Sequence, residues 1–241
     1  MRRVADLRLG LAAESAQDAR TISDLADRVL CHAVDWLEAE HLPHIRRWMG
    51  PNDTPFLDLH AVTRQAKAAF GMRAYGHFKN APGAPDATLF RSVFLTFAHE
   101  HHPPSVVVAA RDQDRQPERQ EGFRQAFEAN DWPFRAILAW AHPEIEAWYL
   151  VGFVPQTDRE HRLLAELRQT LGFDVHRAPE RLAAQGRRDP KPILAELTDG
   201  DLERKTACLA DLDHLETHGS GCGVSQFCQA VRAQIAPLLA R

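Results

Sequence analysis

The chain has 241 residues, of which 44% are hydrophobic and 26% charged, and 29 basic against 33 acidic residues give a formal net charge of −4. These proportions are typical of a globular protein and exclude a disordered or fibrous chain. The acidic balance also excludes a protein that coats nucleic acid through bulk charge, because such binding needs lysine and arginine to replace counterions. Any nucleic-acid binding must therefore use a local patch.

Neither a membrane span nor a secretory signal is expected from the sequence. No run approaches the roughly 18–20 apolar residues that a membrane-spanning helix needs. Near the start, Asp6 and Arg8 interrupt an apolar stretch, which leaves it shorter than the about 7–15 residues of a secretory signal. A first β-strand fits this stretch better, and we expect a cytoplasmic protein.

The cysteines give a weaker indication of the same compartment. They are Cys31, Cys208, Cys222 and Cys228, with no CxxC pair and no zinc spacing. We interpret them as buried thiols in a reducing cytoplasm. A metal held by Cys222 and Cys228 is the alternative.

In the first half of the chain the sequence predicts a strand followed by several helices. The short apolar run LRLGLAA at 7–13 predicts a buried strand. Apolar residues at helical spacing predict a helix from Asp18 to about Glu40, with Ser15 as its N-cap. Proline and glycine interrupt the segment that follows. We interpret residues 41–104 as a helical insertion, with helices predicted near 57–71 and 86–100.

The clearest strand is SVVVAA at 105–110, which is β-branched and apolar like a central parallel strand. A polar helix near 117–130 and a strand at 134–140 follow, and this order indicates βαβ units. The remainder reads as helices. The sequence therefore predicts an α/β protein with a parallel-rich sheet flanked by helices. We expect one domain over 1–200, with the insertion at about 41–104, and a helical extension over 201–241 that packs on the same domain.

Acidic residues follow each of the three predicted strands, where ligands gather in open parallel sheets. Glu14 follows the first strand, Asp112 and Asp114 the second, and Glu144 and Glu146 the third. Carboxylates two positions apart on extended chain point the same way, so Asp112 and Asp114 can converge on one ion. Magnesium prefers such carboxylates together with waters and phosphate oxygens. The set predicts a divalent-metal site, although helix capping or plain exposure is the alternative for Glu14 and Glu144.

Four motifs carry a family resemblance: AES-x-x-D at 13–18, VVVAARDQD at 106–114, HPEIEAW at 142–148 and DPK at 189–191. Together they resemble the Toprim domain of OLD-type (overcoming-lysogenization-defect) nucleases. They resemble still more closely a family of small stand-alone Toprim-like proteins, often encoded beside an ABC- or SMC-like ATPase in phage-defence operons. The resemblance spans about Leu7 to Leu197, with the stretch between Leu42 and Pro104 unmatched.

The resemblance implies a Toprim-like fold and a nuclease that uses two ions of Mg²⁺ or Mn²⁺, with DNA ahead of RNA as the substrate and an ABC/SMC-like ATPase as a partner. Glu14 would bind metal or act as a general base, and Lys191 would stabilise charge on the scissile phosphate. The metal ligands that it implies are Glu14, Asp18, Asp112, Asp114, Glu144 and Glu146. Two departures from the family pattern are Ser15, where glycine is usual, and Asp18, where glutamate is usual.

Three arginines flank the acidic turn, namely Arg111, Arg115 and Arg119. They are candidates for positioning a phosphate backbone, and simple charge balance beside the carboxylates is the alternative. The nuclease hypothesis has an alternative of its own, a non-catalytic nucleic-acid-binding or regulatory subunit that keeps the fold and the acidic pocket.

Two other segments are weaker candidates for a site. His99 and His102 would share a helix face, as metal ligands can, but histidines also favour helix C-termini. The glycine-rich stretch HGSGCGVS at 218–225 could cradle a phosphate. It lacks the ending of a P-loop, and the end of one helix followed by the cap of the next explains it more simply.

Overall fold

The computed structural model describes residues 7–70, 76–78, 81–114 and 116–239. The chain forms two compact units. The sheet unit comprises Met1–Arg111, Gln116–Ala139 and Gln229–Arg241, and the helical unit comprises Asp112–Arg115 and Trp140–Cys228. The sequence-based organisation, one domain over 1–200 with a helical extension over 201–241 packed on it, stays a prediction.

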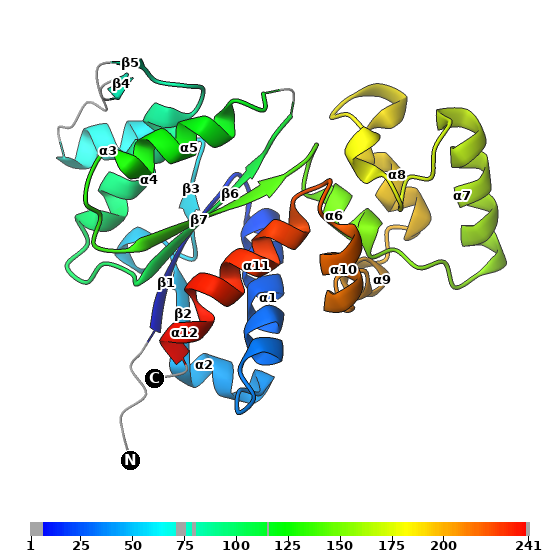
Figure 1. Ribbon diagram of the computed structural model, residues 1–241, viewed down its shortest axis with the longest axis horizontal. Helices are drawn as coiled ribbons and strands as arrows, with labels where there is room; N and C mark the ends of the chain where they lie inside the picture. Colours follow the sequence, from blue (N-terminus) through cyan, green and yellow to red (C-terminus); the bar gives the residue numbers. More distant parts are fainter. Residues whose placement is uncertain (1–6, 71–75, 79–80, 115, 240–241) are drawn as a thin grey trace. The chain divides into compact units, whose positions relative to one another are not determined.

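The sheet unit is built on a parallel sheet with the strand order β2-β1-β6-β7, in which β3 also pairs with β1 (Figure 1). The strands are β1 (Leu7–Ala13), β2 (Arg46–Met49), β3 (Leu57–Asp58), β6 (Val106–Asp112) and β7 (Arg135–Ala141). β1 runs parallel to β2, β3 and β6. The predicted α/β class and parallel sheet are confirmed, and β1, β6 and β7 are the three predicted strands. β2 and β3 were not predicted, because RRWM is half basic and β3 has only two residues.

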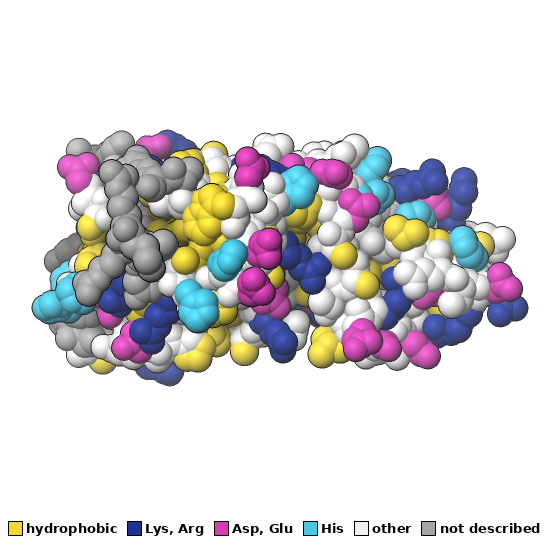
Figure 2. All heavy atoms as spheres, turned by 90° about the horizontal axis from the view of Figure 1, so that it is seen from below, with side chains coloured by type: hydrophobic (Ala, Val, Ile, Leu, Met, Phe, Trp, Pro, Cys, Tyr) yellow, Lys and Arg dark blue, Asp and Glu magenta, His cyan; other side chains and the backbone are white. Residues whose placement is uncertain are grey.

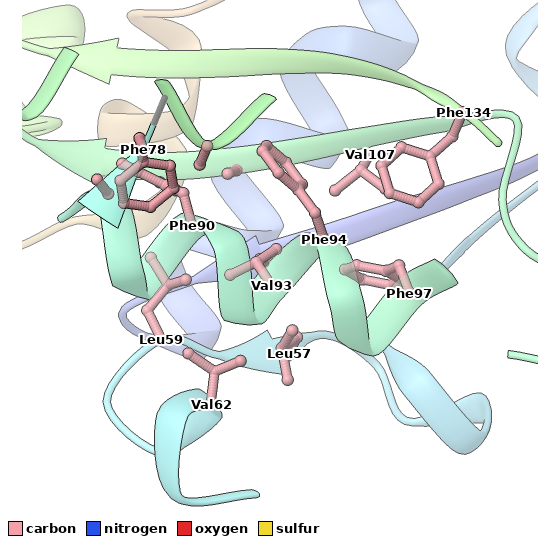
Figure 3. Close-up of a cluster of buried hydrophobic side chains, with 14 residues drawn as sticks. Leu57, Leu59, Val62, Phe78, Phe90, Val93, Phe94, Phe97, Val107 and Phe134 are labelled. Atoms are coloured by element: carbon pink, nitrogen blue, oxygen red, sulfur yellow. The ribbon is translucent and has the colours of Figure 1, made fainter. Parts of the chain in front are cut away.

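One face of this sheet is covered by α4 (Ala87–Ala98) and α5 (Arg119–Glu128). They meet the sheet through a buried hydrophobic cluster, in which Phe90, Val93 and Phe94 of α4 are fully buried (Figure 3). On the sheet side the cluster contains Val107 and Ala109. These are alternate residues of β6, as expected when one face of a strand packs on a helix.

The other face is covered by α1 (Ala16–Ala33) and by residues 229–239 (Figure 1). These two segments lie side by side, since Arg232 Nη2 is 3.2 Å from His32 Nδ1. The predicted N-cap of α1 is confirmed, because Ser15 Oγ accepts a hydrogen bond from Asp18 N–H. The helix ends at Ala33, however, and not near Glu40. Val34 takes an extended conformation and caps Leu30 O with its N–H.

The sheet unit also contains several shorter elements. They are η1 (Ala39–His41), α2 (Leu42–Ile45), η2 (Pro51–Asp53), α3 (Val62–Phe70), β4 (His77–Phe78), β5 (Ala81–Pro82) and α12 (Ala236–Leu239). β4 and β5 form a separate antiparallel pair. The segment interpreted as a helical insertion therefore holds short helices, and it also contributes β2 and β3 to the parallel sheet.

The helical unit confirms the predicted helical C-terminal part. Its elements are α6 (Glu146–Val151), α7 (Asp158–Leu171), η3 (Pro179–Arg181), η4 (Gly186–Arg188), α8 (Pro190–Leu197), α9 (Leu202–Ala207), α10 (Leu212–His218) and the first part of α11 (Val224–Gln234). Its core is centred on Trp148, which is fully buried and stacks on Phe227 with ring centroids 5.3 Å apart. Trp148 Nε1 donates to Cys222 O at 2.8 Å, so the polar end of the indole is satisfied.

The surface carries charges of both signs. On the face shown in Figure 2, acidic and basic side chains are interspersed, which agrees with the small net charge. Within the described part of the chain, no helix combines the length and the hydrophobicity that a membrane span requires.

A buried ion pair joins α1 to the edge strand β2. Arg46 Nε donates to Asp27 Oδ1 at 2.8 Å, and Nη2 of the same guanidinium binds Oδ2. Trp48 Nε1 donates to Asp27 Oδ1 at 2.9 Å. The side chains of Arg46 and Asp27 are only 19% and 12% exposed, so removing one partner would leave the other charge without compensation.

We therefore expect Asp27→Ala to lower the free energy of unfolding by about 3 kcal/mol, as breaking a buried pair does. Urea denaturation followed by circular dichroism measures this change. The matched control is Asp24→Ala, which removes a carboxylate from the same helix that is 56% exposed and pairs with Arg20 at 3.7 Å. It should shift stability by less than about 0.5 kcal/mol. Equal effects of the two variants would show that the buried pair does not stabilise this edge.

Candidate functional site

The parallel register of β1 and β6 brings Glu14 to Arg111. Ala12 pairs with Ala109, so the residues two positions further on lie next to each other at the carboxyl edge of the two strands. There Arg111 Nη1 binds Glu14 Oε1. The side chains of Arg111 and Glu14 are 12% and 21% exposed. Glu14, the first predicted metal ligand, is therefore held by an arginine.

Arg111 also binds Asp86, a residue that no sequence motif marked. Arg111 Nε donates to Asp86 Oδ2 at 2.7 Å, and Arg119 Nε lies 3.2 Å from the same oxygen. Asp86 precedes α4 in a left-handed conformation with φ 63°. Its loop lies tightly against α5, because a Cβ at Gly122 would come within 1.9 Å of Pro85 O. Only glycine permits this approach.

These four side chains form an alternating row of charges, Glu14–Arg111–Asp86–Arg119, which we call the ionic chain. Arg111 and Arg119 are 12% and 11% exposed, so their guanidinium groups are largely withdrawn from solvent. This arrangement fits the alternative to phosphate binding, namely that Arg111 and Arg119 balance the charge of nearby carboxylates. Arg115, the third predicted phosphate contact, lies outside the described residues.

Asp18, the second predicted ligand in this unit, takes part in the cap of α1. Its N–H donates to Ser15 Oγ at 3.1 Å, and Ser15 Oγ–H donates to its Oδ2 at 2.8 Å. Besides Arg111, His60 lies near Glu14, with its Nε2 4.0 Å from Glu14 Oε1. The roles of Glu14 and Asp18 as metal ligands stay predictions.

In the helical unit, Asp112 and Asp114 are hydrogen-bonded to the HPEIEAW segment. Asp112 ends β6, and its Oδ1 accepts a hydrogen bond from Ile145 N–H at 3.0 Å. Asp114 has a left-handed backbone with φ 52°, and its N–H donates to Pro143 O at 3.1 Å. The DQD and PEIE motifs of the predicted metal site are thus in direct contact.

Glu144 is the most buried of the predicted acidic residues, with 7% of its side chain exposed. Its Oε1 lies 3.3 Å from Lys191 Nζ. Its Oε2 is buried and has no hydrogen-bond partner among the described residues. Burial raises the pKa of Glu144, and the ammonium of Lys191 offsets part of that rise. A buried carboxylate oxygen without a partner is costly, and a bound cation would satisfy it.

Lys191 lies among several of the predicted carboxylates. Burial lowers the pKa of Lys191, but the charges of Glu146, Glu144 and Asp112 together raise it above its usual value. Lys191 is therefore cationic at neutral pH. It stands in the first turn of α8, which Asp189 begins by accepting a hydrogen bond from Lys191 N–H at 2.9 Å.

The structure thus brings together Asp112, Glu144, Glu146 and Lys191, which we call the acidic cluster. Three carboxylates face one ammonium, so a divalent cation would balance the remaining charge. The residues that could hold it are the carboxylates of Asp112, Glu144 and Glu146. Among the described residues, no group of three or more His, Cys, Asp or Glu side chains is already arranged as a set of metal ligands.

The cysteines and the glycine-rich stretch at 218–225 have structural surroundings. Cys208, Cys222 and Cys228 are buried thiols, as predicted, whereas Cys31 is only half-buried. Burial raises the pKa of Cys222 to about 12, so this thiol is protonated at neutral pH and is a poor nucleophile. In the glycine-rich stretch, Cys222 O accepts hydrogen bonds from Trp148 Nε1 and from His142 N–H. The stretch therefore supports the core of the helical unit.

The histidines near the end of α4 contact neighbouring groups. His99 Nδ1 lies 2.8 Å from Leu95 O, one helical turn earlier. His101 Nδ1 lies 2.9 Å from His102 Nε2. These contacts suit the helix-end alternative for this group of histidines.

Comparisons of the chain with protein-family models, with curated proteins and with solved structures found no match. The resemblance to Toprim-like nucleases therefore rests on the four sequence motifs, and it remains a hypothesis.

If the acidic cluster binds a divalent cation, Mn²⁺ should stabilise the folded protein. Saturation at about 100 times the dissociation constant adds roughly 2.7 kcal/mol, which corresponds to an increase in Tm of roughly 5–10 °C for a chain of this size. Differential scanning fluorimetry with and without Mn²⁺ measures the shift. Glu144→Gln should abolish it, because an amide oxygen is a much weaker ligand than a carboxylate.

The matched control is Glu203→Gln, which removes an exposed carboxylate from α9 of the same unit. It should keep the Mn²⁺-induced shift of the wild type. Loss of the shift in both variants, or in neither, would contradict a site at Glu144.

Proposed function

We propose that the chain is a divalent-metal-dependent nuclease of Toprim type that cleaves phosphodiester bonds of nucleic acid, DNA ahead of RNA, with an ABC/SMC-like ATPase as its partner in phage defence. The observation that carries the proposal is the buried carboxylate of Glu144. One of its oxygens contacts Lys191 Nζ at 3.3 Å, and the other has no hydrogen-bond partner among the described residues.

The residues of the acidic cluster suit this chemistry. Asp112, Glu144 and Glu146 would hold Mg²⁺ or Mn²⁺, which when bound polarises phosphate oxygens and activates water. Ile145 N–H holds Asp112 in place at 3.0 Å. Lys191 is cationic and its side chain is 55% exposed, so its ammonium can reach a phosphate in solvent and stabilise the charge that develops there.

A non-catalytic subunit is the second candidate, and the ionic chain favours it. Glu14, the residue that the resemblance assigns to metal binding or base catalysis, is bound by Arg111. A carboxylate oxygen that a guanidinium already occupies is less accessible to a metal ion or to an attacking water. A protein of this kind would bind metal and nucleic acid without cutting.

Plasmid cleavage separates the two candidates. With Mg²⁺ or Mn²⁺ the wild type should nick or linearise supercoiled DNA, and Asp112→Asn should reduce the rate at least about a hundredfold, because the substitution removes a charged ligand at the reacting centre. Agarose gels measure the rate, and Glu203→Gln serves as the control that should cut like the wild type. Equal cutting by the wild type and Asp112→Asn would assign the activity to a contaminant.

Lys191→Met tests the proposed role of the ammonium. Removing one preorganised electrostatic contact to the transition state costs about 10²–10³ in kcat, whereas the Mn²⁺-induced increase in Tm should persist. The combination of abolished cleavage and retained metal binding identifies a residue that acts on the phosphate. If cleavage is unchanged, Lys191 serves only to balance the charge of Glu144.

A further inference from the structure

An arginine-rich segment leads into α8 of the helical unit. Arg177, Arg181, Arg187 and Arg188 are all exposed, and they precede Lys191 by a few residues. The acidic residues within this segment are Glu180 and Asp189, and Asp189 is used to cap α8. The segment therefore presents an excess of positive charge beside the first turn of α8.

Two of these arginines are held over one aromatic ring. The guanidinium carbons of Arg181 and Arg188 lie 4.4 and 5.7 Å from the ring centroid of Phe173. The ring itself is fixed, since Phe173 is only 5% exposed. A guanidinium that lies over an aromatic face keeps its N–H donors at its edge, where they can bind an anion.

Carboxylates do not neutralise these two guanidinium groups. In the part of the chain that the structure describes, no carboxylate forms an ion pair with Arg181 or Arg188, whereas Arg46, Arg111 and Arg204 all bind carboxylates. Two positive charges on one ring repel each other. A bound phosphate would offset this repulsion and could accept hydrogen bonds from their N–H donors.

We infer that Arg181 and Arg188 bind a backbone phosphate of nucleic acid and hold the strand near the start of α8. The inference rests on the proposed function, because it supplies the substrate contact for the site at Lys191. It assigns that contact to residues other than Arg111 and Arg119, whose side chains are 12% and 11% exposed and engaged with Asp86.

DNA binding without cleavage tests the inference. Fluorescence anisotropy of a labelled duplex of about 30 base pairs, recorded with the full chain in EDTA over a range of salt concentrations, gives both the affinity and its salt dependence. The double variant Arg181→Gln/Arg188→Gln should bind at least about tenfold more weakly. Its log–log salt slope should fall by about 0.9, because the one phosphate that the two arginines bind is no longer neutralised.

The matched control is Arg64→Gln/Arg162→Gln, which removes two exposed arginines elsewhere in the chain and should change affinity less than about twofold. Arg181→Lys/Arg188→Lys keeps both charges and should keep the salt slope of the wild type, but it should bind more weakly, because lysine does not reproduce a stacked guanidinium. An unchanged circular dichroism spectrum and Tm of the glutamine variant show that its weaker binding is not due to misfolding. Equal affinities of the two glutamine variants would overturn the inference. So would wild-type binding to anionic phospholipid vesicles but not to DNA.

The outcome is distinguishable from that of the proposed function, because EDTA removes any metal-dependent cleavage. Loss of DNA binding in Arg181→Gln/Arg188→Gln, in a protein that never cuts plasmid, would uphold the phosphate site and reject the nuclease. Normal binding by this variant, with metal-dependent cutting by the wild type, would do the reverse.

Discussion

The parallel pairing of β1 with β6 determines where the charged residues of the sheet unit meet. Because Ala12 pairs with Ala109, Glu14 and Arg111 leave the sheet at the same edge and form an ion pair. A shift of one residue would turn the side chains of β6 to the opposite faces and would remove Val107 from the hydrophobic cluster under α4. The buried cluster thus enforces the register, and the register places the ion pair.

Burial and charge act in opposite directions in the acidic cluster. Burial makes ionised Glu144 unfavourable and raises its pKa. Burial also lowers the pKa of Lys191, but three nearby carboxylates more than reverse this effect and keep the ammonium charged. One ammonium cannot balance all three carboxylates. The proposed cation would balance the excess of negative charge around this buried oxygen.

The sequence predicted those parts of the molecule that depend on local pattern. The apolar runs of β1 and β6, the amphipathic α4 and the Ser15 cap are all set by neighbouring residues. β2 could not be predicted, because its strand character comes from pairing with β1. Asp86 was missed for a similar reason. Its importance comes from contacts with Arg111 and Arg119, distant in sequence, and no motif surrounds it.

The same limit applies to the arginines. Position in the sequence favoured Arg111 and Arg119 as phosphate contacts, because they flank the acidic turn. Their exposure and partners make them members of an internal ion network, and a guanidinium already bound to carboxylates gains little from a phosphate. Arg181 and Arg188 carry no motif, yet they combine exposure, a rigid aromatic support and a lack of carboxylate partners among the described residues. Availability of the donors, which depends on tertiary contacts, decides which arginines can bind a ligand.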